Sequence, residues 1–239
     1  MTAIAIITAR GGSKRIPKKN IKDFYGKPII AYSIEAALES SIFDEVMVST
    51  DSEDIADVAI KYGAKVPFMR SKNTSDDFAT TAEVLLEVLE NYRIRNIRFD
   101  YMCCIYPTAP FITVSKLQDA LKKLISSDAD SVIPVVRFSY PPQRAVIIKD
   151  GLLGYQYPEY EKARSQDLDP VYHDCGQFYI CKTEKFKRYN SLFTPNTVPL
   201  IIAEEEVQDI DNDIDWKLAE IKYKLYKSHN LIAGTKGFV

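Results

Sequence analysis

Cations and glycines are concentrated in one short stretch near the N-terminus of this 239-residue chain. Residues 9–20 read Ala-Arg-Gly-Gly-Ser-Lys-Arg-Ile-Pro-Lys-Lys-Asn, with five cations, and no acid follows before Asp23. Gly11 and Gly12 would let the backbone approach a ligand closely and adopt positive φ angles. A glycine turn that carries N–H donors and cations is suited to binding a triphosphate.

The same stretch has a plainer interpretation, which is a basic surface turn that follows a strand. It is not a Walker A loop, because GxxxxGK[ST] is absent from it, and GxGxxG is absent as well. Short motifs match by chance at an appreciable rate. The residues alone therefore leave both interpretations open.

Two aspartates near the C-terminus could bind a metal ion. Asp209 and Asp211 alternate in an extended piece before the last predicted helix, which puts both carboxylates on one side. Two carboxylates together with nucleotide phosphates are common ligands of Mg²⁺. Helix capping is the alternative role for aspartates in this position, and Asp213 and Asp215 are expected to serve it.

Strands and helices alternate from residue 3 to residue 137. The apolar, β-branched run 3–8 predicts a buried first strand, and further strands are expected at 45–50, 101–106 and 131–136. This alternation predicts an α/β fold with a doubly wound, mostly parallel sheet that helices cover on both faces. Ligands bind at the carboxyl ends of the strands in such sheets, where the cationic stretch begins.

Residues 138–175 interrupt the alternation with prolines and tyrosines and show no helical period. The segment is too long for a featureless loop in a compact domain. We therefore interpret residues 1–239 as a single domain with an inserted arm at about 138–175. Later strands are expected at 177–181 and 198–202. A last amphipathic helix is marked by Ile214, Leu218, Ile221 and Leu225.

Composition narrows the possible partners and the compartment. A net charge of −2 argues against nucleic acid as the main partner. We see no signal-peptide pattern and no long apolar span, so no membrane association is expected. The four cysteines are irregularly spaced, and Cys103 and Cys104 alternate faces in an apolar strand. Buried thiols of this kind indicate a reducing compartment, and we expect a cytoplasmic protein.

Beyond these general features, residues 9–21 resemble the nucleotide loop of the CMP-sugar synthetases. The resemblance extends over nearly the whole chain, from the first strand to the final helix. A second motif reads Arg-Ser-Gln-Asp-Leu at 164–168, Tyr-His-Asp at 172–174 and Gly-Gln-Phe-Tyr at 176–179. This motif is most similar to the branch of the family that acts on pseudaminic acid.

The resemblance implies an enzyme that activates a nonulosonic acid with CTP, uses Mg²⁺ and releases pyrophosphate. It implies metal-binding roles for Asp209 and Asp211. Catalytic contributions are expected from Arg10, Lys14, Lys19 and Asp211. The implied nucleotide-binding residues are Ala9, Arg10, Gly11, Gly12, Ser13, Asn20, Arg70, Ser75 and Asp76. A solvated loop is the alternative interpretation of the polar residues 70–77.

The resemblance also implies a set of sugar contacts for a nine-carbon keto acid. These are Tyr106, Arg144, Arg164, Gln166, Gln177 and Tyr179. Arginine binds carboxylate in a bidentate manner, although Arg144 and Arg164 could each be ordinary surface charges. Relatives that act on sialic acid often have glutamine where Tyr106 stands, which fits a different sugar here. A packed aromatic is the alternative role for Tyr106.

In the CMP-sugar synthetases the arm is a dimerisation element that helps close the sugar site of the partner, so a homodimer is expected. Three other functions remain open. One is a synthetase for sialic, legionaminic or 3-deoxy-manno-octulosonic acid, and a second is a nucleotidyltransferase that uses another nucleoside triphosphate. The third is a non-catalytic nucleotide-binding regulator, which would have less need of the aspartate pair.

Overall fold

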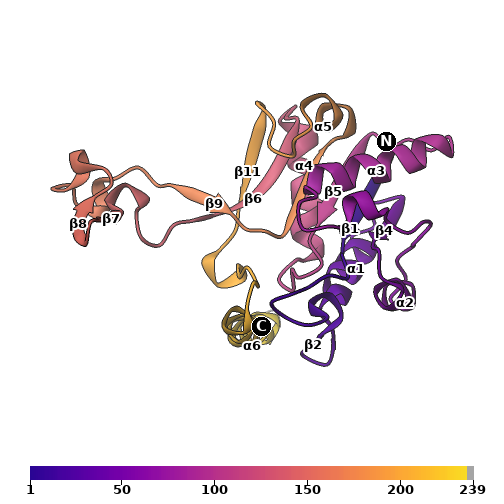
Figure 1. Ribbon diagram of the computed structural model, residues 1–239, viewed down its shortest axis with the longest axis horizontal. Helices are drawn as coiled ribbons and strands as arrows, with labels where there is room; N and C mark the ends of the chain where they lie inside the picture. The colour runs from indigo at the N-terminus through magenta and orange to yellow at the C-terminus, as the bar shows by residue number, and fades with distance from the viewer. Residues whose placement is uncertain (236–239) are drawn as a thin grey trace.

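A seven-stranded sheet forms the centre of the molecule (Figure 1). In the computed structural model, which describes residues 1–235, the strand order is β11-β6-β10-β5-β1-β4, and β9 pairs with β6. The strands are β1 (Ala3–Thr8), β4 (Glu45–Ser49), β5 (Tyr101–Ile105), β6 (Ser131–Arg137), β9 (Tyr172–Asp174), β10 (Phe178–Lys182) and β11 (Thr197–Ile201). β1 is parallel to β4 and β5, and β6 is parallel to β11, whereas β10 lies antiparallel between β5 and β6.

Helices cover both faces of this sheet. One face packs on α1 (Ile29–Glu39), α2 (Glu53–Lys61) and α4 (Val114–Ser126). The other face packs on α3 (Thr81–Ile94) and α5 (Thr183–Tyr189). Side chains alternate along a strand, so Cys103 faces the first layer and Cys104 the second. The predicted doubly wound, mostly parallel α/β fold is confirmed.

The segment before α3 shows why that helix begins at Thr81. Thr80 Oγ1 accepts a hydrogen bond from Glu83 N at 3.2 Å, and Glu83 Oε2 accepts one from Thr80 N at 2.7 Å. This reciprocal capping box satisfies two backbone donors that the first turn leaves without helical partners. The first turn of α3 is thereby fixed beside the cleft described below.

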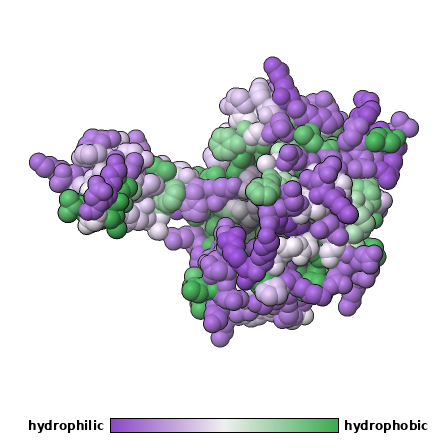
Figure 2. All heavy atoms as spheres, in the orientation of Figure 1, coloured by the Kyte–Doolittle hydropathy of each residue, from purple (hydrophilic) through white to green (hydrophobic). Residues whose placement is uncertain are grey.

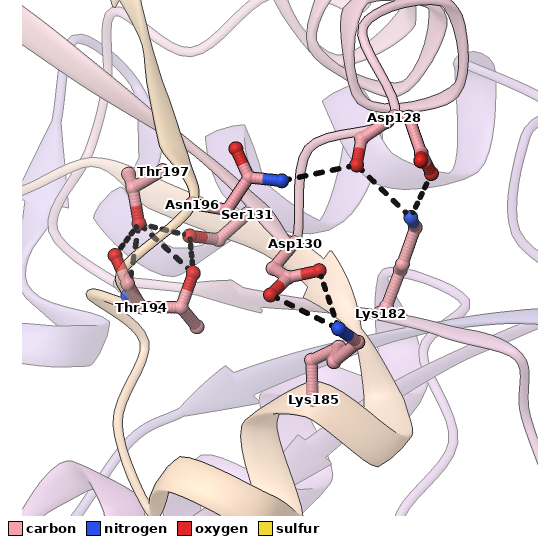
Figure 3. A network of polar contacts seen from close by, with 8 residues as sticks. All are labelled: Asp128, Asp130, Ser131, Lys182, Lys185, Thr194, Asn196 and Thr197. Atoms are coloured by element: carbon pink, nitrogen blue, oxygen red, sulfur yellow. Dashed lines mark hydrogen bonds and ion pairs between the residues drawn. The ribbon is translucent and has the colours of Figure 1, made fainter.

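A polar network anchors the antiparallel strand β10 at the end of the sheet where β6 begins (Figure 3). Lys182 Nζ contacts Asp128 Oδ1 at 2.7 Å, and Lys185 Nζ contacts Asp130 Oδ1 at 3.1 Å. The start of β6 is tied to β11 through the hydroxyl groups of Ser131, Thr194 and Thr197. This end of the sheet is opposite the carboxyl ends of the parallel strands. We therefore assign the network a structural role.

The long helix α6 (Asp213–Thr235) packs on a separate aromatic cluster that includes Phe24, Trp216 and Tyr223. Phe24 belongs to a short ribbon formed by β2 (Asp23–Phe24) and β3 (Lys27–Pro28). A final helix is confirmed, but the four apolar residues that mark it in the sequence are exposed. The helix therefore has an aromatic inner face and a second apolar face that points outward.

Capping at the start of α6 is confirmed for one predicted residue and wrong for the other. Asp215 Oδ2 accepts hydrogen bonds from Asp211 N at 2.9 Å and Asn212 N at 3.0 Å. Asn212 Oδ1 accepts from Ile214 N and Asp215 N. The carboxylate of Asp213 instead lies 3.7 Å from Lys22 Nζ, because Asn212 already occupies the cap position.

Of the predicted arm at about 138–175, residues 138–171 extend away from the body (Figure 1), whereas β9 pairs with β6 in the sheet and Cys175 is buried. The arm contains a hairpin of β7 (Val146–Lys149) and β8 (Leu152–Tyr155), with three short 3-10 turns at Pro142–Arg144, Pro158–Tyr160 and Ser165–Asp167. Hydrophobic side chains lie on its surface (Figure 2), among them Ile148, Leu152 and Leu153.

Three further 3-10 turns lie in the body, at Lys19–Ile21, Lys72–Thr74 and Glu204–Glu206. Within residues 1–235, the helices are all too short or too polar to cross a membrane.

Candidate active site

A cleft of about 340 Å³ lies at the carboxyl end of β1. Its walls come from the loop after β1, the loop 70–81, the turn 106–108 after β5, and the segment before α6. We call it the first cleft. The predicted site residues that line it are Arg10, Ser13, Lys14, Lys19, Asn20, Arg70, Asp76, Tyr106 and Asp211.

The loop after β1 is closed by contacts of its own residues. Asn20 is buried, and its Nδ2 donates to Arg10 O at 2.9 Å. Gly11 N donates to Asp51 Oδ1 at 2.8 Å, and a Cβ at Gly11 would lie only 2.9 Å from Ser52 Cβ. Glycine is therefore required at residue 11 because the loop passes closely over the start of α2.

Two expectations about this loop need correction. Neither Gly11 nor Gly12 has a positive φ angle, and the left-handed residue of the loop is Lys18, with φ 50°. The predicted close approach of Gly11 is made to the protein's own Ser52. Ala9 is fully buried in the hydrophobic core, so its side chain is not part of the cleft wall.

Cations of this loop are paired with acids from distant parts of the chain. Arg10 Nη1 contacts Asp77 Oδ1 at 2.8 Å and Asp76 O at 2.9 Å, and Lys14 Nζ donates to the same Asp77 carboxylate. Hydrogen bonds from Lys14 and Arg10 hold the pKa of Asp77 below its usual value. Arg15 Nη2 donates to Asp211 Oδ1 at 3.0 Å.

Asp77 and Arg15 were not among the predicted site residues, although both line the first cleft. Arg15 is one of the five cations of the loop, and Asp77 directly follows the predicted Asp76. Charge complementarity between the basic loop and the acidic residues 76–77 is the sequence signal that would have pointed to Asp77.

Lys19 lies among the charges of the predicted metal-binding aspartates. Lys19 Nζ donates to Ile210 O at 2.6 Å. Burial lowers the pKa of Lys19, while the charges of Asp211 and Asp209 act in the opposite direction. Burial also raises the pKa of Asp209, and the charge of Asp211 raises it further. The two carboxylates thus repel one another, which a divalent cation would relieve.

This acidic pair fits Mg²⁺ as a ligand set. Mg²⁺ is commonly held by one or two carboxylates, with waters and substrate phosphates completing the coordination. Within the described residues, no group of three or more His, Cys, Asp or Glu side chains could hold a metal ion without other ligands. The remaining ligands would therefore come from nucleotide phosphate oxygens and water.

The loop 70–77 contributes two of its three predicted residues to the first cleft. Arg70 is buried, and its guanidinium donates to Ser49 Oγ at 3.0 Å and Ser49 O at 2.6 Å. Asp76 shapes the loop, because its Oδ1 accepts from Phe78 N and Ala79 N. Ser75 lies outside the cleft lining, with its hydroxyl donating to the backbone of Ser71 at 2.6 Å.

A second cleft of about 630 Å³ adjoins the first. Tyr106 lines both clefts, while Asp211 lines the first and Asp209 the second, so the acidic pair lies at their junction. The Tyr179 hydroxyl donates to Asp174, and the ring centroids of Tyr106 and Tyr179 are 5.5 Å apart. Burial raises the pKa of Tyr106, which is therefore both a packed aromatic and a lining residue.

The other predicted sugar contacts are not brought to these two clefts within one chain. Arg164 Nε donates to Asp167 Oδ2 at 2.7 Å, and Arg144 Nη1 lies 3.3 Å from Ser165 Oγ, both in the arm. Gln166 lines a third cleft at the root of the arm. Gln177 is buried, and its Nε2 donates to Glu206 O at 2.7 Å. Gln177 therefore holds the segment before α6 and does not reach either cleft.

Comparisons with known proteins identify the family to which the chain is similar. Residues 4–167 match a family model described as cytidylyltransferase. The chain is 43% identical over 226 residues to a pseudaminic acid cytidylyltransferase of Campylobacter jejuni, covering 94% of this chain and 97% of the relative. It is 35% identical over 229 residues to a CMP-N,N'-diacetyllegionaminic acid synthase of Legionella pneumophila, covering 92% and 95%.

The fold is also similar to that of a solved structure, CMP:2-keto-3-deoxy-manno-octonic acid synthetase complexed with CTP. The TM-score is 0.67 at 17% sequence identity, with 95% of this chain and 100% of the other chain covered. At this identity the likeness concerns the fold alone.

Proposed function

The chain belongs to the cytidylyltransferase family, and from this premise we propose that it activates pseudaminic acid with CTP. The products are the CMP-sugar and pyrophosphate. One observation carries the proposal: the basic loop after β1 and the acidic pair Asp209–Asp211 meet where two adjacent clefts join. Such a junction suits the transfer of a nucleotide from one bound substrate to another.

In the proposed complex, the triphosphate lies against the loop after β1. Arg10, Lys14 and Lys19 are the cations that would neutralise the phosphate oxygens. Asp209 and Asp211 would hold Mg²⁺, which supplies charge neutralisation at the phosphates when bound. Arg70, fixed on Ser49, contributes to the wall of the nucleotide cleft.

The sugar acid would occupy the second cleft, beside Tyr106 and Tyr179. Its anomeric oxygen attacks the α-phosphorus in line with the bond to pyrophosphate. The new O–P bond forms as that bond breaks, and pyrophosphate leaves with the bonding electron pair. The hydroxyl proton must be removed, and the carboxylates at the junction provide a base for it.

The choice of pseudaminic acid is supported by the degree of likeness. Identity is 43% to the Campylobacter jejuni enzyme named for pseudaminic acid and 35% to the Legionella pneumophila enzyme named for a legionaminic acid, at similar coverage. A legionaminic or sialic acid enzyme is the principal alternative.

Pyrophosphate release with CTP and Mg²⁺ tests the reaction. Purified protein is offered pseudaminic, legionaminic, sialic and 3-deoxy-manno-octulosonic acids in parallel, and each is repeated with ATP, GTP or UTP. We expect release with CTP and pseudaminic acid at the highest kcat/KM. CTP binding without release on any acid would instead support a non-catalytic regulator.

We also infer a homodimer in the cytoplasm. Exposed apolar side chains on the arm, such as Ile148, Leu152 and Leu153, form a surface of the kind that marks a protein partner. Arg144 and Arg164 reach neither cleft of their own chain, which supports a role for them in the site of the partner. The four cysteines are free and buried, as suits a reducing compartment.

A further inference from the structure

We propose that Lys116 is a positioning residue for the proposed Mg²⁺ site, an inference that rests on the proposed function. Lys116 lies on α4, and its Nζ pairs with Glu206 Oε2 at 2.7 Å. Glu206 ends the 3-10 turn that opens residues 204–211, which we call the metal segment because it carries Asp209 and Asp211. The ion pair therefore joins the body of the protein to the segment that bears the predicted metal ligands.

The metal segment depends on other parts of the chain for its shape. Residues 207–210 belong to no helix or strand, so regular secondary structure does not fix their backbone. Backbone carbonyl groups that lose contact with water need other donors, and here side chains from other elements supply them. The contacts are Lys222 Nζ to Val207 O at 2.7 Å and to Glu204 O at 3.3 Å, Gln177 Nε2 to Glu206 O at 2.7 Å, and Lys19 Nζ to Ile210 O at 2.6 Å.

An apolar anchor lies between the two predicted metal ligands. Ile210, which separates Asp209 from Asp211, is fully buried in the aromatic cluster that also contains Phe111. Lys116 Nζ donates to Phe111 O at 2.8 Å in addition to its contact with Glu206. One ammonium group thus ties the start of the metal segment to a residue of the cluster that holds Ile210.

Burial sets the Lys116–Glu206 pair apart from the surface ion pairs of the protein. The side chain of Lys116 is 11% exposed and that of Glu206 is 26% exposed. Burial lowers the pKa of Lys116, while the hydrogen bond and the charge of Glu206 raise it. A buried ion pair is weak evidence for stability, because the desolvation of both charges offsets their attraction. We therefore assign the pair to the placement of the metal segment.

Lys116 allows positioning to be measured apart from substrate contact. Lys116 and Glu206 line neither the first nor the second cleft, whereas Lys19 lines the first and Lys222 the second. Replacement of Lys19 or Lys222 would change the lining of a cleft and the metal segment together. An effect of Lys116 on metal binding would have to pass through the metal segment.

The first test measures how strongly Mg²⁺ tightens the binding of CTP. The Kd for CTP is determined by calorimetry with EDTA and again with Mg²⁺, and the ratio of the two values reports the coupling between metal and nucleotide. Lys116→Met should lower this ratio about tenfold, as for residues that support metal ligands. The Kd in EDTA should stay the same. No sugar acid is present, so the measurement does not depend on turnover.

Lys185→Met is the matched control. Lys185 also pairs with a buried aspartate, Asp130 at 3.1 Å, but at the opposite end of the sheet. This change should lower the unfolding temperature and leave the Mg²⁺ ratio unchanged. If Asp211→Ala abolishes the tightening and Lys116→Met does not lower it, the positioning role is wrong and the proposed function stands. CTP binding that ignores Mg²⁺ in the unchanged protein would overturn both.

A double variant separates positioning from the cost of an unpaired buried charge. Lys116→Met alone leaves the Glu206 carboxylate without its partner and should lower the unfolding temperature. Adding Glu206→Leu should restore that temperature, because replacing both members of a buried pair by apolar residues is often neutral. It should not restore the Mg²⁺ ratio, since the link from α4 to the metal segment is still missing. Restoration of both quantities would make the pair purely structural and overturn the inference.

The Mg²⁺ dependence of pyrophosphate release gives a further readout. Lys116→Met should raise the half-saturating Mg²⁺ concentration about tenfold. At saturating Mg²⁺ its kcat should approach that of the unchanged protein, because both aspartates are still present. A lower kcat at an unchanged Mg²⁺ requirement would contradict the proposal. Gln177→Met removes the donor to Glu206 O and should shift the Mg²⁺ requirement in the same direction, which keeps the proposal testable if Lys116→Met does not fold.

Discussion

At the residue scale, the cations beside the first cleft already have carboxylate partners. Asp77 pairs with Arg10 and Lys14, and Asp211 pairs with Arg15. Exposed ion pairs of this kind add little to stability. Binding of a triphosphate would exchange these carboxylates for phosphate oxygens, so the acids compete with the proposed substrate for the same cations.

Asp77→Asn should therefore tighten CTP binding. The change removes the competing charge and leaves Arg10 and Lys14 available to the phosphates. We expect the Kd for CTP, measured by calorimetry, to fall by less than about tenfold, because exposed pairs are weak.

Asp54→Asn is the control for this change. Asp54 pairs with Lys18, which does not line the first cleft, so the Kd should stay the same. Weaker CTP binding by the Asp77 variant would mean that this carboxylate contributes to the nucleotide site and does not compete with it.

Asp211→Ala should abolish pyrophosphate release and leave the protein folded. Its carboxylate has one exposed partner, Arg15, and the cap of α6 is formed by Asn212 and Asp215. The loss in unfolding free energy should thus stay below about 1 kcal/mol. Turnover and thermal unfolding are measured on the same preparation.

Asp213→Ala provides the comparison, because Asp213 is exposed and only approaches Lys22 at 3.7 Å. Its turnover should be close to that of the unchanged protein. If both aspartate variants release pyrophosphate normally with Mg²⁺, the assignment of the metal ligands is wrong.

At the scale of elements, the start of α3 matters because Thr81 and Val84 line the first cleft. Thr80→Ala removes the hydroxyl that accepts from Glu83 N and should lower the free energy of unfolding by about 1 kcal/mol. Thr80→Ser keeps the hydroxyl and should retain most of the stability. Urea unfolding of the three proteins measures the difference.

The pH dependence of this cap has a definite sign. The backbone N–H and hydroxyl of Thr80 donate to the Glu83 carboxylate and hold its pKa below the ordinary value. The stabilisation is therefore complete above the unfolded-state pKa of Glu83 and is lost as the pH falls through its folded-state pKa. The difference in unfolding free energy between the unchanged protein and Glu83→Gln should shrink on acidification below about pH 4. A difference that is constant from pH 7 to pH 3 would contradict this account.

Local sequence patterns predicted the individual strands and helices better than they predicted which strands lie side by side in the sheet. Buried β-branched runs are local properties, so β1, β4 and β5 lie close to their predicted ranges. The antiparallel insertion of β10 between β5 and β6 was not predicted, because strand neighbours are set by long-range packing. In α6 the cleaner apolar period belongs to the outward face, while the buried face uses Trp216, Ala219 and Tyr223.

In the candidate site, too, local features were predicted from the sequence and long-range contacts were not. The basic loop after β1 was visible in the sequence because its cations and glycines are contiguous. Its partners Asp77 and Asp211 lie more than sixty residues away in the chain, and only the fold brings them together. The role of Gly11 was missed in part, since its crowding by Ser52 is a tertiary contact.

At the scale of the whole molecule, the arm is the part least able to be stable on its own. Its hairpin of β7 and β8 is paired with no other strand within the described residues, and a two-stranded hairpin is only marginally stable in water. Ile148, Leu152 and Leu153 remain exposed on it. Packing against a second copy would bury these side chains and stabilise the arm.

A mixture of two inactive variants tests whether the arm acts on the partner. Arg10→Ala disables the first cleft, and Arg164→Ala removes an arm cation that reaches neither cleft of its own chain. If Arg164 acts across a two-fold interface, a mixed dimer has one site with both defects and one site with none. After subunit exchange at equal amounts, half of the dimers are mixed, so about one quarter of the full activity should return.

The alternatives give different results in this mixture. If Arg164 served its own chain, each site of a mixed dimer would carry one defect, and no activity would return after exchange. Exchange is verified independently by mass spectrometry of differently labelled subunits, so a failure to mix is not mistaken for a negative result. Full activity from a protein that sediments as a monomer would also exclude the arrangement. Recovery near one quarter therefore requires that an arm residue from one chain completes the site built around Arg10 of the other.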